Sequence, residues 1–309
     1  MGIELRRFES RDLEALRALV RDPSMSGEFD VLQSPQAVEG WLADPYRDPA
    51  LHWMAWSEGG LAGFASPFVL PGREGRFAMV RIGVHADRRR RGIGSALLRR
   101  TFDEIAARHP DVRELCVSAW LPSDPADGFA ARHGFKRVRT FWLMERRGGP
   151  SAAPEWPPGI TLAFHDGSER GYRDITEAYN DSFAHHYHAT QLTVEDTRAL
   201  FTRPGFHPEG YVLAYRAGRC VGFCRCEIHH ERGEIAVLGT IGEARGIGLG
   251  RALLRWGTQW LERQRSPRIT LLVDGENEGA LRLYRSEGFD VARTRASWSR
   301  PNPAGPSHG

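Results

Sequence analysis

Two series of short apolar runs divide the chain and predict two sets of β-strands. The first set stands at 3–8, 50–57, 60–70, 76–85, ELCVSAW (114–120) and HGFKRVRTFWLM (133–144). The second set is ITLAFHD (160–166), YVLAYRAG (211–218), RCVGFCRCEI (219–228), GEIAVLGTI (233–241), RITLLVD (268–274) and EGFDVARTRASW (287–298). Runs of this length, bounded by turn residues, are typical of strands.

Helical patterns stand at matching places in the two series. Helices are expected near 10–21 and 34–43, and in the second series from 170 and from 193. A longer helix follows the fourth strand of each series; it ends near 108 in the first series and near 264 in the second. A short helix follows the fifth strand of each series, and in the second series it spans 277–287. Leu249, Leu253 and Trp260 share one helix face, as in a helix packed on a sheet. The repeated order predicts a duplicated domain.

The length of 309 residues also favours two domains. The stretch RRGGPSAAPEWPPG, 146–159, has the composition of a linker. We therefore expect a first domain at 1–147, a linker at 148–159, a second domain at 160–300 and a disordered tail at 301–309. The predicted fold class is α/β (α+β), with two domains in tandem, each a mixed and mostly antiparallel sheet flanked by helices.

Composition and charge narrow the class of protein. Hydrophobic residues make up 41 %, enough for a core in each half, and the formal net charge is only +3. The RRRR run at 88–91 has no aromatic-interleaved basic surface beside it, so no nucleic-acid partner is expected. The N-terminus lacks the apolar run of a signal peptide, and no stretch approaches the ~18 apolar residues of a membrane span. We expect a cytoplasmic protein without a membrane partner, as a monomer or homodimer.

The cysteines raise the question of a metal. Cys220, Cys224 and Cys226 share parity along one predicted strand, near His229, His230 and the HHYH cluster at 185–188. No pair of cysteines has finger-like or ribbon-like spacing. We expect small half-buried residues and no metal.

A glycine-rich phrase occurs once in each half, as RRRRGIGSALL (88–98) and ARGIGLGRALL (244–254). A strand, a glycine-rich turn and a helix start form an anion site, because the backbone N–H groups and the helix dipole point at the ligand. The Walker ending Gly-Lys-Ser/Thr is absent. A dinucleotide fingerprint would follow the first strand of its unit rather than the fourth.

The phrase Arg-x-x-Gly-x-Gly followed by Ala-Leu-Leu resembles the acyl-CoA signature of the GNAT acetyltransferase superfamily. NEGALRLYRSEGF, 277–289, resembles its second signature. The resemblance implies acetyl-CoA as cofactor, with its pyrophosphate on the 245–250 amides and its pantetheine along 234–241. The cofactor-binding residues so implied are Leu238, Gly239, Thr240, Arg245, Gly246, Ile247, Gly248, Leu249, Gly250, Arg251 and Asn277, and in the first half Ile82, Val84, Arg89, Arg90, Arg91, Gly92, Ile93, Gly94 and Ser95.

Aligning the two phrases indicates which half is catalytic. Glu234 then corresponds to Ala78, Tyr284 to Ala130, and Asn277 roughly to Ser123. Acetyl transfer to an amine benefits from a base and from a donor to the leaving sulfur. We therefore expect Glu234 as base and Tyr284 as acid, a backbone N–H near Leu238 or Gly239 for the oxyanion, and a first half that has lost catalysis. Glu227 and a histidine among 185–188 are the other candidate bases.

The second half resembles the mycothiol synthase family in AYNDSFAHHYH, GFHPEGYVLAYRAGRCVGFC and LLVDGENEGALRLYRSEGF. That family acetylates the cysteine amine of a cysteinyl-glucosaminyl-inositol, with the C-terminal domain catalytic. The resemblance implies the same roles for Glu234 and Tyr284. LGTIG stands where the family often has LGVDP, so Thr240 and Gly242 are departures.

The leading hypothesis is an acetyl-CoA-dependent N-acetyltransferase for a small-molecule primary amine. One alternative is an acyl-CoA-binding regulatory protein without turnover. Another is an acetyltransferase for an antibiotic amine or a protein N-terminus.

Overall fold

A computed structural model describes residues 2–29, 32, 35–72, 75–122, 124–202, 206–229 and 232–305. The chain forms two compact units, Met1–Val138 with Ala296–Gly309, and Arg139–Arg295. It leaves the first unit within strand β6 (Lys136–Arg146) and returns within strand β12 (Phe289–Pro301). The stretch 148–159 contains neither helix nor strand.

The sheet of the first unit runs in the order β1–β2–β3–β4–β5 and ends on the last residues of β12. These strands are Glu4–Arg7, Trp53–Ser57, Gly60–Leu70, Arg76–Val84 and Val112–Leu121. Neighbours from β1 to β4 are antiparallel, whereas β4 and β5 are parallel. The β4–β5 pairing stops at Val80↔Val117, and both strands continue unpaired with each other beyond that point.

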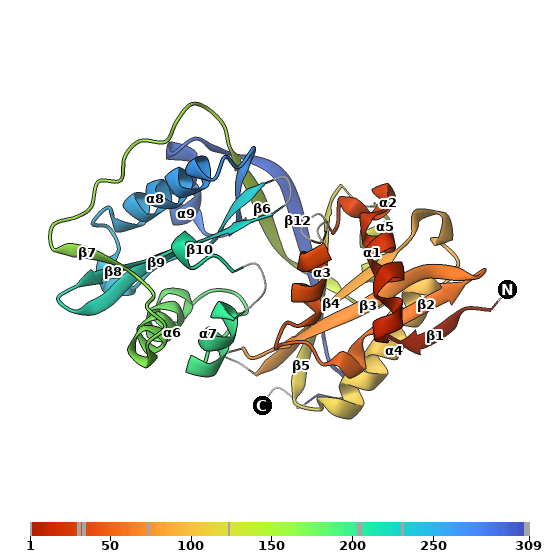
Figure 1. The fold of residues 1–309 in the computed structure, drawn as a ribbon. Coiled ribbons are helices and arrows are strands. Elements are labelled where there is room, and N and C mark those ends of the chain that lie inside the picture. The colour runs from red at the N-terminus through yellow and green to blue at the C-terminus, as the bar shows by residue number, and fades with distance from the viewer. Residues whose placement is uncertain are drawn as a thin grey trace. The chain divides into compact units, whose positions relative to one another are not determined.

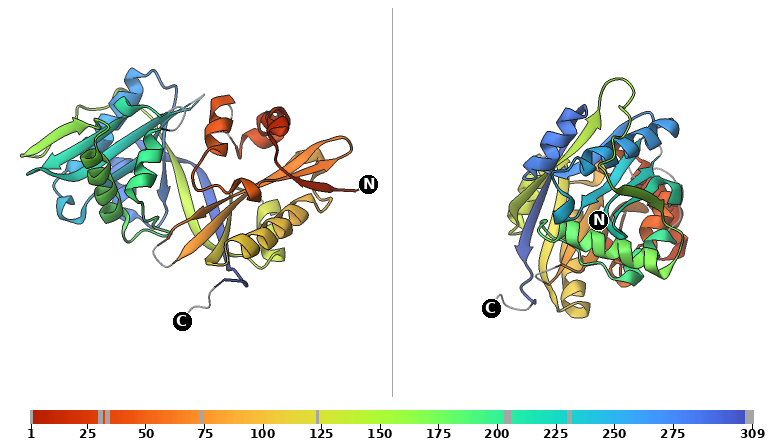
Figure 2. Two further views of the ribbon diagram at one scale, coloured as in Figure 1. Left: turned by 60° about the horizontal axis from the view of Figure 1, so that its bottom comes forward. Right: turned by 90° about the vertical axis from the view of Figure 1, so that its left-hand side faces the viewer.

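Helices cover both faces of this sheet (Figure 1 and Figure 2). One face carries α1 (Leu13–Arg21), α2 (Pro23–Ser26) and α3 (Pro35–Leu42), whose apolar residues pack on Met54 and Phe64. The other face carries α4 (Ile93–Arg108) and α5 (Asp124–Arg132), packed on Val80 and Leu115. Side chains of a strand alternate between the two sides of the sheet. The strands carry apolar residues on both sides, so each face has an apolar surface for its helices.

The second unit repeats this plan. Its sheet runs β12–β6–β11–β10–β9–β8–β7, with β7 to β11 at Ile160–Phe164, Tyr211–Arg216, Arg219–Ile228, Gly233–Thr240 and Ile269–Asp274. The helices are α6 (Glu169–Phe183), α7 (Val194–Phe201), α8 (Leu249–Arg263) and α9 (Glu278–Ser286). A Cβ added at Gly239 would meet Phe223 and Ser182 of α6, whereas one added at Gly257 of α8 would meet Cys224. The helices of this unit therefore also cover both faces.

The predicted fold class and the duplication are confirmed, and the expected strands and helices lie where the sequence patterns predicted them. The tail expected to be disordered from residue 301 is held against the first unit in its first part. Asn302 is buried, and its side-chain amide donates to the Val112 carbonyl at 2.8 Å. Residues 306–309 lie outside the described part of the chain.

All four cysteines are buried. Burial raises the pKa of Cys220 to about 12 and also raises the pKa of Cys226. Since a metal ligand has to be a thiolate, this environment favours the packing role expected for them. His230 lies outside the described residues.

Within the described residues, no helix combines the length and the apolar character needed to span a membrane.

Candidate active site

Strands β10 and β11 separate in the middle of the second unit. They pair at Gly233↔Ile269 and Glu234↔Thr270, after which β10 stays on β9 and β11 stays on β6. The inner edge of β10 from Ile235 to Thr240 therefore offers backbone groups that β11 does not use. An extended chain with amide groups can pair with such an edge as an added strand would. Leu238, Gly239 and Thr240, expected to contact the cofactor, lie on this stretch.

The glycine phrase forms the turn between β10 and α8. Gly246 and Gly248 have φ angles of +79° and +89°, which L side chains rarely adopt. Leu249 is buried in the core, while Ile247 is 39 % exposed. The first N–H groups of α8 lack partners within the helix, as at any helix start. The loop thus has the geometry of an anion site at a helix N-terminus.

The arginines beside this loop are already engaged by the protein. The Arg245 guanidinium donates to the Ser182 carbonyl of α6 at 3.0 Å. Arg251 forms an ion pair with Glu287 at 2.9 Å. Asn277 caps α9, with its side chain accepting from the Ala280 amide at 3.1 Å. Contacts from this loop to a phosphate would therefore come mainly from backbone amides.

Glu234 lies at the last β10–β11 pair, directly opposite Glu227 of β9. Its side chain is 18 % exposed and lies 3.0 Å from Arg232 and 3.3 Å from His229. Desolvation raises the pKa of Glu234, but His229 and Arg232 lower it by more, so the pKa lies below its usual value. Glu234 is thus a carboxylate at neutral pH.

A β-bulge decides which way Glu234 points. The β9–β10 register shifts between Ile235 and Val237, which changes the alternation of side chains along β10. Cys224 and Cys226 of β9 lie against α8. Arg225 and Glu227 therefore face the α6 side, and the bulge brings Glu234 to that side with them.

Tyr284 lies on α9, where it is partly buried against the core and 6.2 Å from Phe289 between ring centroids. Burial and the nearby Cys224 raise the pKa of Tyr284 to about 12. In the described part of the chain, no group forms a hydrogen bond with its hydroxyl. A phenol with this pKa remains protonated at neutral pH and is suited to donate a hydrogen bond.

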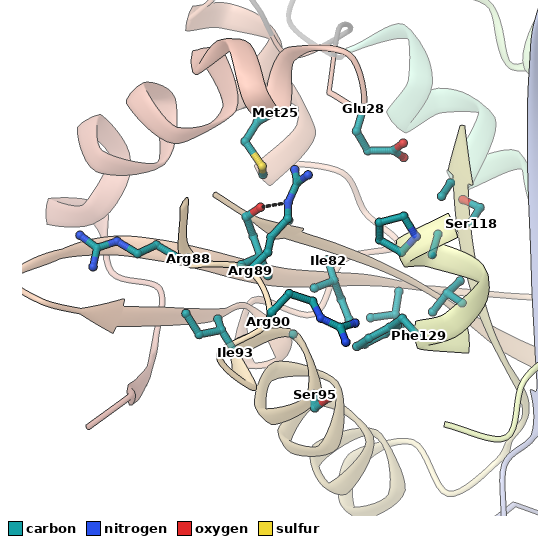
Figure 3. Close-up of a pocket in the computed structure, with 18 of the residues that line it drawn as sticks. Met25, Glu28, Ile82, Arg88, Arg89, Arg90, Ile93, Ser95, Ser118 and Phe129 are labelled. Carbon is teal, nitrogen blue, oxygen red and sulfur yellow. Dashed lines mark hydrogen bonds between the residues drawn. The ribbon is translucent and has the colours of Figure 1, made fainter. Parts of the chain in front are cut away.

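The first unit has the same loop and a cavity of about 410 Å³ beside it. Gly92 has φ +83°, and Arg90 adopts φ +65° at the position that corresponds to Gly246. Figure 3 shows the cavity, with Arg90 extending toward Phe129 and Arg88 pointing the other way. Ile82, Val84, Ile93, Gly94 and Ser95 are among the lining residues, and Glu28 stands at the far end.

Most arginines in the glycine loop of the first unit also bind to other groups of the protein. Arg89 donates to the Val84 and Ser24 carbonyls at 3.0 Å each, and Arg91 pairs with Glu58 at 2.7 Å. Ser95 lies 2.9 Å from the His133 ring. Among the described residues, Arg90 has neither an ion pair nor a hydrogen bond, so its charge is available at the cavity.

The sheet register corrects one correspondence between the two halves. Strands β3 and β4 pair without a bulge from Gly63↔Val84 to Leu70↔Phe77. Matching the Gly-Phe pairs 63–64 and 222–223 places Phe68 and Met79 where the second unit has Glu227 and Glu234. Ala78, the partner expected from the alignment, lies instead in the core on the α4 side.

Ala130 is buried in α5. It is the counterpart of Tyr284, which lies in α9. Ser123, the expected counterpart of Asn277, lies outside the described residues. Within the described part of the first unit, no carboxylate and no phenol stand at the positions of Glu234 and Tyr284.

Comparison with known proteins identifies the family. A model of the acetyltransferase (GNAT) family matches residues 172–289, and a GNAT acetyltransferase domain model matches residues 48–137. A mycothiol acetyltransferase of Thermomonospora curvata is 36 % identical over 259 residues, which cover 81 % of this chain and 82 % of the relative. The chain belongs to the GNAT acetyltransferase family.

Other relatives span nearly the whole chain. A mycothiol acetyltransferase of Streptomyces griseus is 32 % identical over 91 % of this chain and 90 % of its own length. A solved GCN5-related N-acetyltransferase from Sphaerobacter thermophilus has a TM-score of 0.76 at 24 % identity, covering 99 % of this chain and 98 % of its own. A tandem GNAT protein from the clavulanic acid biosynthesis pathway has a TM-score of 0.74 at 19 % identity, covering 99 % and 100 %.

These findings confirm the tandem GNAT architecture, the acetyltransferase activity and acetyl-CoA as the cofactor expected from the sequence. The two glycine phrases fall within the two matched segments.

Proposed function

We propose that the second unit acetylates the primary amine of a small molecule related to the substrate of the mycothiol acetyltransferases. The cysteine amine of a cysteinyl-glucosaminyl-inositol is the first candidate. The observation that carries the proposal is the β10 bulge, which brings an ionised Glu234 to the α6 face beside the point where β10 and β11 separate. An acceptor amine approaching from that face would meet this carboxylate.

Acetyl-CoA supplies an activated acetyl thioester in this scheme. Glu234 accepts a proton from the amine nitrogen, directly or through a water, as the nitrogen bonds to the acetyl carbon. An N–H of Leu238 or Gly239 donates to the carbonyl oxygen while that oxygen gains charge. The C–S bond breaks, and Tyr284 donates a hydrogen bond to the leaving sulfur.

The raised pKa of Tyr284 determines whether its hydroxyl transfers a proton to sulfur or only donates a hydrogen bond. A thiol titrates near 8.5, so a full proton transfer from a phenol near 12 is unfavourable in the resting site. A hydrogen bond from the phenol to the developing thiolate needs no such transfer. We therefore assign Tyr284 the role of hydrogen-bond donor to sulfur, with solvent able to supply the final proton.

The pantetheine would lie along Leu238–Thr240, and the pyrophosphate on the amides of the 245–250 loop. Gly246 and Gly248 support this placement, since their positive φ angles shape the turn and no side chain stands in the way. The engaged guanidinium groups of Arg245 and Arg251 hold the loop against α6 and Glu287.

A turnover assay separates the enzyme from a protein that only binds acyl-CoA. We expect CoA release above the background hydrolysis rate when the full chain meets acetyl-CoA and the preferred amine of a panel. The panel should include the cysteinyl-glucosaminyl-inositol, an aminoglycoside and a peptide with a free N-terminus. Tight acetyl-CoA binding without CoA release for any amine would contradict the proposal and favour a regulatory role.

The first unit is proposed to bind acetyl-CoA without catalysis. Its cavity follows the loop of Arg90 and Gly92, but apolar Phe68 and Met79 stand where the second unit has carboxylates. A Cβ added at Gly94 would lie 3.3 Å from the Phe129 ring, which lines the cavity.

Replacing Gly94 with leucine should therefore weaken acetyl-CoA binding to the first unit by about tenfold or more, while the acetylation rate of the second unit stays within about twofold. Calorimetric titration would show two sites in the wild type and one in the variant. Gly128→Leu is the control, because Gly128 is exposed on α5 and nothing lies within 4 Å of the added Cβ. Loss of turnover in folded Gly94→Leu protein would show that the first unit takes part in catalysis.

A further inference from the structure

The C-terminal end of helix α6 is fixed to the glycine loop of the second unit. The Arg245 guanidinium donates to the Ser182 carbonyl at 3.0 Å, and this carbonyl belongs to the last turn of α6. Carbonyls at a helix C-terminus lack partners within the helix, and a cation is favourable there. Ser182 also lies directly over Gly239, because a Cβ added to Gly239 would come 3.0 Å from the Cβ of Ser182. The end of α6 therefore covers the stretch of β10 proposed to hold the thioester.

The first unit holds its own glycine loop in the same way. Arg89, the first residue of the Arg-x-x-Gly-x-Gly phrase in this unit, donates to the Ser24 carbonyl at 3.0 Å. Ser24 therefore corresponds to Ser182. Glu28 and His186 each follow their serine by four residues. These two positions are therefore counterparts.

Backbone hydrogen bonds after the two serines agree with this correspondence. The N–H of Glu28 donates to the Met25 carbonyl at 3.0 Å. The N–H of His186 donates to the Phe183 carbonyl at the same distance. Both segments thus form a turn closed by the same bond, between a residue and the third residue before it.

The contacts of Glu28 show what this position faces in the first unit. Glu28 and Met25 both line the cavity beside the glycine loop (Figure 3). The Glu28 Oε2 accepts from the Trp120 backbone N–H at 3.2 Å. Trp120 lies on β5 beyond Val117, where β5 has separated from β4. A side chain at this position therefore reaches the separation of the two strands.

His186 takes the same place beside the separation of β10 and β11. Its ring is half-buried and packs edge-on against Phe183, with 4.9 Å between the ring centroids. Burial lowers the pKa of His186, and the charges of Asp274 at the end of β11 and Arg245 after β10 also act on it. The ring is therefore neutral at neutral pH. Among the described residues, no group forms a hydrogen bond with its ring nitrogens.

The chemistry of this ring limits what it can bind. A neutral imidazole has one N–H donor and one acceptor nitrogen. It suits an uncharged group that both donates and accepts, such as a hydroxyl or an amide. An anionic group would need a cation, and the nearby Arg245 guanidinium already donates to Ser182.

We propose that His186 binds an uncharged polar group of the acceptor on the α6 side, beside the amine whose proton Glu234 accepts, and so determines which amines the second unit takes. Arg245 is a positioning residue, because it holds the end of α6 that carries His186. This inference rests on the proposed function, since it needs an acceptor on this face. It gives His186 a role in binding and leaves the proton transfer to Glu234.

The experiment measures kcat and both KM values with the amine that the wild type acetylates best. His186→Phe keeps an aromatic ring against Phe183 but removes the hydrogen-bonding nitrogens. We expect the KM for the amine to rise by about tenfold or more, while kcat and the KM for acetyl-CoA stay within about threefold. His186→Gln restores an uncharged donor and acceptor, and it should keep the KM for the amine within about threefold of the wild type.

His207→Phe is the matched control, because His207 is another half-exposed histidine beside an aromatic ring. It lies 6.2 Å from Trp260 of α8, between ring centroids, and so belongs to the face away from α6. We expect this variant to keep both KM values. An unchanged KM for the amine in His186→Phe would overturn the assignment. A fall in kcat by orders of magnitude at constant KM would also contradict it, and would make His186 the base.

Arg245→Gln tests the positioning step. It should raise the KM for the amine, and adding it to His186→Phe should cause no further rise, because both changes act on the same contact. A rise confined to the KM for acetyl-CoA would show that Arg245 binds the cofactor instead.

Failure of this inference differs from failure of the proposed function. If the wild type acetylates no amine, the proposed function fails and the assignment of His186 fails with it. If the wild type turns over and His186→Phe matches it in the KM for the amine, only the assignment fails.

Discussion

Replacing Tyr284 with phenylalanine is expected to lower kcat by about 10²-fold or more, with little change in the KM for acetyl-CoA. The variant removes one oxygen from a partly buried ring that has no hydrogen-bond partner among the described residues, so the fold should be unaffected. In the proposed mechanism the variant loses the donor to the leaving sulfur, an interaction that strengthens only as the C–S bond breaks. Steady-state CoA release under saturating amine measures the effect.

Tyr215→Phe is the matched control for this change. Tyr215 lies on β8 and donates to Asp174 at 3.0 Å, away from the separation of β10 and β11. We expect it to keep wild-type turnover. Wild-type-like turnover in Tyr284→Phe would remove Tyr284 from the mechanism.

The reverse substitution in the first unit should restore nothing. Ala130→Tyr places a phenol in α5, but Met79 and Phe68 leave the α1–α3 face of that unit without a base. In the double variant Tyr284→Phe with Ala130→Tyr, we therefore expect the low rate of Tyr284→Phe alone. Recovery of turnover would show that the first unit needs only the phenol to be active.

The duplication and the loops could be predicted from the sequence because both depend on local patterns. The two glycine phrases, the strand alternation and the helical spacing each act over a few residues, and they gave the element order correctly. The fit of Gly248 to a left-handed turn follows from the same local chemistry.

Two features could not be predicted because they depend on pairing between strands. The β10 bulge changes which face Glu234 occupies, yet no residue type marks its position. An ungapped alignment therefore matched Glu234 to Ala78, whereas the sheet places Met79 there. The division of β12 between the two units likewise follows from pairing between strands that are far apart in the sequence.

Replacing Glu234 with glutamine should lower kcat/KM by about 10²–10⁴-fold, the range expected for loss of a general base. The lowered pKa of Glu234 makes it a weak base toward a free ammonium, which titrates near 8 for an α-amino group. Proton transfer becomes favourable only as the nitrogen bonds to the acetyl carbon and grows more acidic. We therefore propose that the carboxylate acts in the transition state rather than by deprotonating the bound substrate beforehand.

The pH profile distinguishes this role from a simple charge effect. Because Glu234 is ionised above its lowered pKa, the rise of kcat/KM between pH 6 and 9 should follow the acceptor amine in both the wild type and Glu234→Gln. In the variant, kcat/KM should reach a lower plateau but should rise over the same pH range. A shift of that rise with the substitution would show that Glu234 itself titrates in this range.

Glu227→Gln is the decisive control, since Glu227 lies directly opposite Glu234 on β9 and pairs with Arg225 at 3.2 Å. Both substitutions remove one negative charge from the same small cluster, so a general loss of electrostatic attraction for the amine would raise KM in both. Only the base should change kcat by orders of magnitude. If Glu227→Gln abolishes turnover while Glu234→Gln retains it, the base is Glu227, and the bulge serves to place its neighbour as the charge partner of Arg232.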